Sequence, residues 1–169
     1  MKALFISIQD IKRHSLIDGN LDATKITPYI EKAQDIHVQS YLGTDLYEKF
    51  QSIIIAQTMD EVENADYKLL INNYIKPMLV EWSLVMYLPF ASITIANGGV
   101  FKHSSENSET LSKDEVDYIQ EQTRINANFY TDRLVKYLCD NSTKFPEYKT
   151  NSGSDISPTG YVDYLTWLT

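Results

Sequence analysis

Apolar residues recur along most of the chain at steps of three and four, which is the period of an amphipathic helix. The clearest such pattern starts at Thr24 or Thr27, before Pro28, a residue type favoured in a first helical turn, and stops at Gly43, a common helix terminator. We therefore predict one amphipathic helix over this stretch. Its inner face is expected to consist of Ile26, Tyr29, Ile30, Ala33, His37, Ser40 and Tyr41.

Two shorter helices flank this one. Ser7 and Asp10 stand three residues apart, as in a capping box, so a first helix should begin there and end near His14. Thr44 is placed to cap a further helix, which should end in the polar stretch 57–64. The inner face of that helix is expected to consist of Leu46, Phe50, Ile53 and Ile54.

A long central helix is predicted from Ala65 onward. It is amphipathic at first and then apolar nearly all round over residues 78–88, as expected of a helix buried in the core. Pro77 should kink this helix, and Pro89 should either end it or start a further helical piece running to about residue 96. Residues 78–96 approach the length of a membrane span, but the two prolines and the lack of flanking basic clusters favour a buried core helix.

A second long helix follows a polar connection. Ser112 and Glu115 form a capping box, and the helical period continues from Lys113 to about Asn141. At about 1.5 Å per residue this helix would span roughly 43 Å, which is more than a compact domain of this size needs. Between the two long helices, residues 97–112 are expected to form an arm, either an extended loop or a hairpin. The arm residues singled out as a contact to a neighbouring subunit are Gly98, Gly99, Val100, Phe101, Lys102 and His103.

The composition changes after residue 149. Residues 150–160 are rich in Ser, Thr, Gly, Asn and Asp and lack apolar periodicity, which indicates a flexible linker. The next residues form an apolar tail, whose large side chains are Tyr161, Val162, Tyr164, Leu165, Trp167 and Leu168. Exposed aromatic clusters seldom go unused, so this tail is predicted to dock in a protein partner, as a strand or a short helix. The alternative is a tail folded back onto its own domain.

These patterns predict an all-α fold, a bundle of about four to five helices, with residues 1–149 as the helical domain and 150–169 as linker and docking tail. A chain of 169 residues with 43% hydrophobic residues can bury a core of its own. Twelve tyrosines against six glycines favour half-buried interface positions. The net charge of -8 and the lack of a basic run argue against tight DNA binding.

No group of residues with catalytic or metal-binding spacing is visible. The histidines His14, His37 and His103 fall in different elements, so we expect neither a metal site nor a cofactor. His37 is interpreted as a satisfied interior or interface histidine, because no nucleophile accompanies it. Cys139, the only cysteine, is expected to fill space in the core, and one cysteine alone fits a reducing compartment. We expect the protein not to be an enzyme.

Four passages, in order, carry a resemblance to a known family. They read SIQDIKRHS, ITPYIEKAQDIHVQSYLGTDLYEKF, ITIANGGVFKHSSENSETLSKDEVDYI and NFYTDRLVKYLCDNSTKFPEY. The chain resembles the head-tail connector, or adaptor, proteins of tailed phages, and most closely the ring protein below the portal in crAss-like phages.

The resemblance implies a helical structural subunit of the virion neck, usually repeated twelve times in a ring between the portal protein and the next neck or tail component. It implies that the tail inserts into the portal and that the arm embraces the adjacent subunit. Double-stranded DNA would pass through the ring without specific binding, and no membrane is involved. The subunit would be in the host cytoplasm during assembly. The alternative hypothesis is a cytoplasmic binding module or regulator that uses the same tail on a protein partner.

Overall fold

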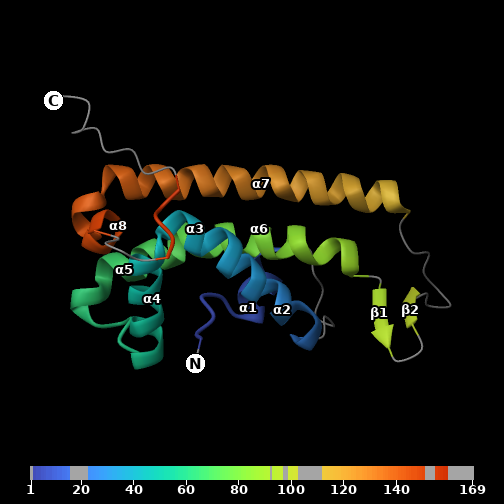
Figure 1. Ribbon diagram of the computed structural model, residues 1–169, viewed down its shortest axis with the longest axis horizontal. Coiled ribbons are helices and arrows are strands. Elements are labelled where there is room, and N and C mark those ends of the chain that lie inside the picture. The colour runs from blue at the N-terminus through green and yellow to red at the C-terminus, as the bar shows by residue number, and fades with distance from the viewer. Residues whose placement is uncertain are drawn as a thin grey trace.

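The protein is mostly helical, and the predicted all-α bundle is confirmed (Figure 1). The computed structural model describes residues 2–15, 23–91, 93–96, 99–102, 112–150 and 155–159. The β-structure within those ranges is one two-stranded hairpin.

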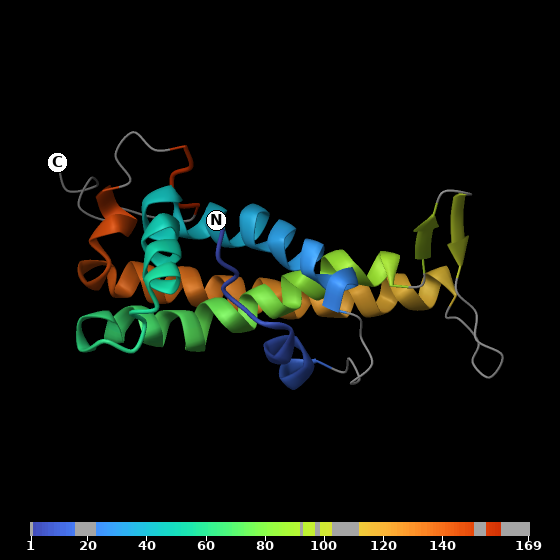
Figure 2. The same cartoon turned by 90° about the horizontal axis from the view of Figure 1, so that it is seen from below.

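The helix α6, Lys76–Tyr87, lies at the centre of the bundle, as its apolar sequence predicts. It packs against α7, Lys113–Asp140, on one side and against α2, Ala23–Ala33, and α1, Ile8–His14, on the other (Figures 1 and 2). Across the parts of the chain that the structure describes, no helix has the length and apolar character that crossing a membrane requires. The buried residues of α6 are Met78, Leu79, Val80, Trp82, Ser83, Leu84, Val85 and Tyr87.

Both predicted capping boxes are present. Ser7 accepts from the Asp10 N–H, and the Asp10 carboxylate accepts from the Ser7 N–H at 2.8 Å, so α1 begins at Ile8. Ser112 and Glu115 make the same pair of contacts at the start of α7. These caps satisfy backbone donors that a first helical turn leaves unpaired, which is why the sequence alone located both helix starts.

In the helical run from α2 to Gly43, the buried residues differ from the predicted inner face in the second half. Between α2 and α3, Gln39–Leu42, lies a π-helical segment, Gln34–Val38. A π turn takes up one extra residue, so the buried apolar positions step from Ala33 to Val38 and then to Leu42. Of the predicted inner face, Ile26, Ile30 and Ala33 are buried, whereas Tyr29, His37, Ser40 and Tyr41 are half-buried, with Tyr29 and Tyr41 packed against the core.

The helix α4, Thr44–Ala56, turns away directly after Gly43 and ends at Gln57, which has a left-handed backbone. Thr44 is the first residue of α4 and not its cap, because Gly43 occupies the capping position. Of the predicted inner face, Ile54 is half-buried, and Tyr47 is buried where the pattern did not place it.

A second π segment lies just before Pro77, where a kink is predicted. A 3-10 turn, Val62–Asn64, leads into α5, Ala65–Leu70, which continues through the π-helical segment Ile71–Ile75 into α6. Pro77 has no N–H and cannot bond to the carbonyl four residues earlier, so the regular α-helical ladder is interrupted beside it.

The helix α6 ends near Pro89, which was one of the two predicted alternatives. A 3-10 turn, Leu88–Phe90, follows α6, and the next described residues form the strand β1, Ile93–Ala96. The alternative of a helical piece running to residue 96 is therefore wrong. Ile93 and Ala96 pair with Lys102 and Gly99 of β2, Gly99–Lys102, in antiparallel register.

After α7 the chain forms further short helical segments that the sequence pattern did not predict. A 3-10 turn, Ser142–Lys144, precedes α8, Pro146–Thr150, which packs against α4. Phe145 is fully buried and Tyr148 nearly so, and the Phe145 ring meets the Tyr67 ring edge-on at 5.5 Å. Two aromatic residues three apart are too short a signal for a helical period, so only the fold reveals their burial.

Candidate functional site

The segment 155–159, part of the predicted linker, is hydrogen-bonded to the corner between α3 and α4. The Thr44 N–H donates to the Ile156 carbonyl at 2.9 Å, and the Ile156 N–H donates to the Thr44 hydroxyl at 3.0 Å. The Thr159 N–H donates to the Ser40 carbonyl at 2.8 Å. Because Thr44 begins α4, its N–H has no partner inside the helix, and the segment supplies one.

Gly43 gives this corner its shape. Its φ of 75° and ψ of 162° lie in a region that residues with a Cβ atom scarcely populate. The chain can therefore leave α3 and enter α4 without a connecting loop, which holds Ser40 and Thr44 close enough to bind one segment. The Gln39 amide donates to the Thr44 hydroxyl at 3.2 Å and steadies it as an acceptor.

The predicted docking residues of the tail lie outside the described residues. The structure supplies the place where the tail starts, since Thr159 is held at Ser40. The residues concerned are Tyr161, Val162, Tyr164, Leu165, Trp167 and Leu168.

Of the hairpin β1–β2, the strand β2 lies in the predicted arm, residues 97–112, and the strand β1 lies before it. Gly99, Val100, Phe101 and Lys102 form β2, whereas Gly98 and His103 lie outside the described residues. The first strand begins at Ile93, earlier than the predicted arm, because its apolar residues continue the pattern of α6 and gave no sign of a change of structure. Figure 1 shows the hairpin at the end of the bundle where α6 finishes and α7 starts.

An aromatic cleft, which the sequence did not predict, lies between α2, α6 and the first half of α7. Its volume is about 370 Å³. The His37 ring is stacked on Trp82 with centroids 3.7 Å apart and planes 9° apart, and Tyr29 stacks on Phe90 at 5.7 Å. The lining residues are Tyr29, Lys32, His37, Trp82, Val85, Met86, Pro89, Phe90, Gln120 and Arg124.

The cleft has a positive character in an acidic protein. Lys32 and Arg124 are among the described lining residues, which include no carboxylate. The Lys32 ammonium lies 5.5 Å from the centre of the Tyr29 ring, and Arg124 pairs with Glu121 at 3.3 Å on the surface. Burial, and then the positive charge of Arg124, lower the pKa of His37 to about 4. His37 is therefore a neutral aromatic wall at pH 7, and the cleft suits a ligand with aromatic and acidic groups.

Only His37 hinted at this cleft in the sequence, as a histidine on an otherwise apolar face. Tyr29, Trp82 and Arg124 come from three separate helices, so their meeting depends on how those helices pack. A short periodic window cannot contain that information.

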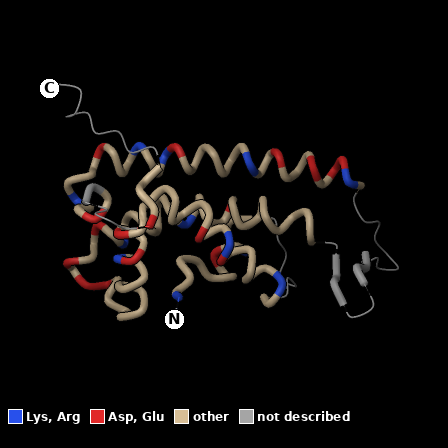
Figure 3. The backbone as a smooth tube through the Cα atoms, in the orientation of Figure 1, with Lys and Arg blue, Asp and Glu red and all other residues tan. Residues whose placement is uncertain are grey.

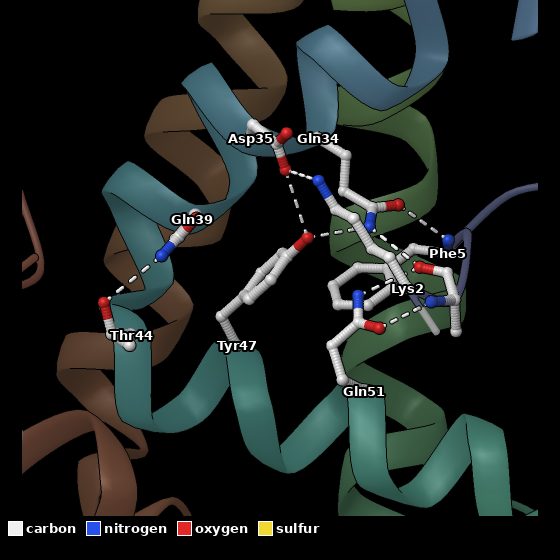
Figure 4. Close-up of polar contacts among 9 residues, drawn as sticks. Lys2, Phe5, Gln34, Asp35, Gln39, Thr44, Tyr47 and Gln51 are labelled. Carbon is white, nitrogen blue, oxygen red and sulfur yellow. Dashed lines mark hydrogen bonds and ion pairs between the residues drawn. The ribbon is translucent and has the colours of Figure 1, made fainter. Parts of the chain in front are cut away.

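A second polar cluster, shown in Figure 4, holds the N-terminal segment in place. Gln34 is fully buried, its amide donates to Ala3 and Tyr47 at 2.9 Å each, and its oxygen accepts from the Phe5 N–H at 2.8 Å. Gln51 accepts from the Ala3 N–H at 2.6 Å and donates to its carbonyl at 2.9 Å. Together these contacts join the N-terminal segment to Gln34, which follows α2, and to α4, so the cluster is a structural clamp.

The remaining candidates for chemistry stay apart. His14 lies in the last turn of α1, and His103 is outside the described residues. The Cys139 sulfur lies 3.9 Å from the Tyr148 hydroxyl, half-buried at the end of α7. Within the described ranges no cluster of His, Cys, Asp and Glu has the makings of a metal site.

One face of α7 carries an exposed apolar stripe. Tyr118, Ile125 and Phe129 recur at helical spacing, and their exposed fractions are 67%, 53% and 63%. The buried residues of α7 begin only at Ala127, so its first half extends past the core, as the predicted length suggested. Exposed apolar stripes of this kind mark contacts with other proteins.

The fold and these surfaces define an all-α bundle with a hairpin, an aromatic cleft and an anchored C-terminal segment. Residues 38–158 match a family of unknown function, DUF6712, and the chain belongs to that family. No curated protein and no solved structure matches the chain.

Proposed function

We propose that this protein is a structural subunit of the connector ring of a tailed phage. It joins the portal protein to the next neck or tail component, and the genome passes through the ring. The resemblance of four passages to such adaptors supports this role, and so does the helical bundle with a hairpin at one end. The matched family has no assigned function, so the proposal depends on the molecule's own features.

The strongest support is the anchored segment 155–159. Its hydrogen bonds to Ser40 and Thr44 make the apolar tail start at one defined place on the bundle. A docking peptide with a defined starting point loses less conformational freedom when it binds than one attached through a fully flexible linker. The six large apolar residues of the tail would then insert into the portal.

The hairpin and the α7 stripe support contacts with copies of the same chain. A ring closes when one surface of a subunit binds a different surface of the next and the rotation between them closes. The stripe offers an apolar surface on α7, and β1–β2 extends beyond the bundle (Figure 2). With these two surfaces, each subunit in a ring of about twelve copies can contact both neighbours.

The charge distribution suits a conduit for DNA. The net charge is -8, and Figure 3 shows acidic residues spread over several helices, with both signs along α7. A surface that repels phosphates lets a duplex slide without specific binding.

Binding to purified portal particles tests the proposal. The full chain is compared with a variant in which Tyr164, Trp167 and Leu168 of the tail are changed to Ser, and with Thr166→Ser as the matched control. We expect the triple variant to lose binding at least tenfold, because the apolar contacts are removed, while the control binds like the wild type. Undiminished binding of the triple variant would remove the docking role.

A second candidate function is a regulator that uses the same tail on another protein. The tail's apolar composition favours both functions equally. Mass analysis of purified virions separates them, because a connector subunit is a constituent of the particle and a regulator is absent from it.

A further inference from the structure

We propose that, before assembly, the C-terminal tail of this chain is held in the aromatic cleft of the same chain. The docking part is the apolar tail, residues 161–168, and the receiving part is the cleft between α2, α6 and α7. This inference goes beyond the proposed function and does not require the portal to be the tail's final partner.

The first support is the short distance between the tail's starting point and the cleft. Thr159 donates to the carbonyl of Ser40, which follows His37 by three residues in the same helical run. At about 1.5 Å per residue this separation is roughly 4.5 Å along the helix axis. Residues 160–168, nine in number, span up to about 30 Å when extended, so the tail can cross the whole cleft.

The second support is the chemistry of the walls. Tyr29, Trp82 and Phe90 offer ring faces, and Met86 offers an adaptable thioether side chain. A volume of about 370 Å³ falls within the range of ligand pockets and holds a part of the tail. Tyr161, Tyr164 and Trp167 are the side chains that suit such walls, because they combine a flat apolar body with a polar tip.

Charge complementarity is the third support. The tail, residues 160–169, contains one acidic residue, Asp163, and no basic residue. Most of the surface of a chain with net charge -8 repels such a segment, whereas the cleft presents Lys32 and Arg124. The Arg124 pair with Glu121 is exposed and therefore exchangeable for a contact with Asp163.

Occupation of the cleft would cover the tail until a partner displaces it. Six exposed apolar residues on a free subunit promote unspecific association. A cis contact of limited area protects the subunit and still yields to a partner that offers a larger apolar surface. The α3–α4 corner then acts as the pivot, since its hydrogen bonds are needed in both states.

Disulfide trapping tests this contact directly. In a Cys139→Ser background, one variant pairs Met86→Cys in the cleft with Tyr164→Cys in the tail. The matched control pairs Ile36→Cys with Tyr164→Cys, because Ile36 is 52% exposed and adjacent to His37 but does not line the cleft. Ile36 lies four residues before Ser40 in the same helical run, so the tail can reach it from Thr159 and only docking favours the Met86 pair.

We expect the Met86 pair to form an intramolecular disulfide several-fold faster than the Ile36 pair in dilute protein without portal. Equal rates, or no disulfide in the Met86 pair, would overturn the proposal. Disulfide-linked dimers in place of the monomeric product would also overturn it, because they would assign the cleft to the tail of a second copy. None of these results depends on portal binding, so failure here and failure of the connector role are distinguishable.

A second measurement avoids any change in the cleft. Trp82 and Trp167 are the two tryptophans, so Trp167→Phe leaves Trp82 in the cleft wall as the reporter. We expect further changes of Tyr161, Tyr164 and Leu165 to Ser to shift its emission to the red by several nanometres, because water enters the vacated cleft. An unchanged emission spectrum would overturn the proposal.

Discussion

At the scale of single residues, the buried polar side chains show how tightly the helices are held in register. The Trp82 indole N–H donates to the Thr131 hydroxyl at 3.0 Å between α6 and α7, and Thr131 is almost fully buried. Gln34 makes three hydrogen bonds where no solvent reaches it. Such groups contribute modestly when paired, but they are costly when one partner is removed.

Thr131→Val should destabilise the fold by about 1–2 kcal/mol, because it leaves the Trp82 N–H without an acceptor in the core. The control is Thr123→Val. Thr123 donates to the carbonyl four residues earlier at 2.8 Å, as Thr131 does at 2.7 Å, but it has no role toward Trp82. Chemical denaturation of both variants measures the difference, and equal losses would mean that the Trp82 contact contributes nothing.

His37 should make stability depend on pH. Its pKa is lowered from 6.5 to about 4, so the unfolded chain binds more protons between these values and stability falls as the pH drops from about 6.5 to about 4. Because the ring is partly exposed, we expect a loss of only about 1 kcal/mol. His37→Phe keeps a ring on Trp82 and removes the titration, so its unfolding free energy should fall less over this window. Parallel pH profiles of the two proteins would contradict this.

At the scale of elements, the helices depend on special backbone positions at their junctions. Two π-helical segments, Gln34–Val38 and Ile71–Ile75, interrupt the α-helical runs, and Gly43 lets α4 start directly after α3. These junctions determine which side chains point at the core and which surround the cleft.

Gly43→Ala should cost about 1–3 kcal/mol, because its backbone angles are in a region that only glycine occupies readily. It should also loosen segment 155–159, measured as faster proteolysis there. Gln57→Gly is the contrasting change, because Gln57 has a φ of 59° and tolerates glycine with a change below about 1 kcal/mol. A harmless Gly43→Ala would show that the corner can relax.

At the scale of the whole molecule, the contact surfaces lie apart from one another. The hairpin is at one end of the α6–α7 pair, and α4, α5 and α8 gather at the other (Figure 1). The α7 stripe runs along α7, which extends past the buried core. A subunit with separate surfaces can contact several partners at once, which a ring requires.

The double variant Ile125→Ser/Phe129→Ser should change stability little, because both side chains are more than half exposed. It should reduce assembly on portal particles if the α7 stripe contacts a neighbour. Ile55→Ser is the control, with 56% exposure on α4. Thermal unfolding checks the first expectation, and counting subunits per portal particle checks the second; equal assembly by both variants would separate the stripe from ring formation.

The sequence by itself determined the helix class and several helix ends. The capping boxes at Ser7 and Ser112 and the terminator Gly43 act within a few residues, so their effects are readable from local spacing. The long apolar stretch around α6 likewise specified a core helix without any knowledge of its partners.

Only the tertiary structure decided which faces meet. The π-helical segment Gln34–Val38 places His37 in the wall of the cleft, beside a tryptophan from α6 and an arginine from α7. The tertiary structure also places part of the predicted linker at the α3–α4 corner, where Ile156 is hydrogen-bonded to Thr44. These contacts join residues far apart in the chain, and their energies depend on packing geometry that no local pattern encodes.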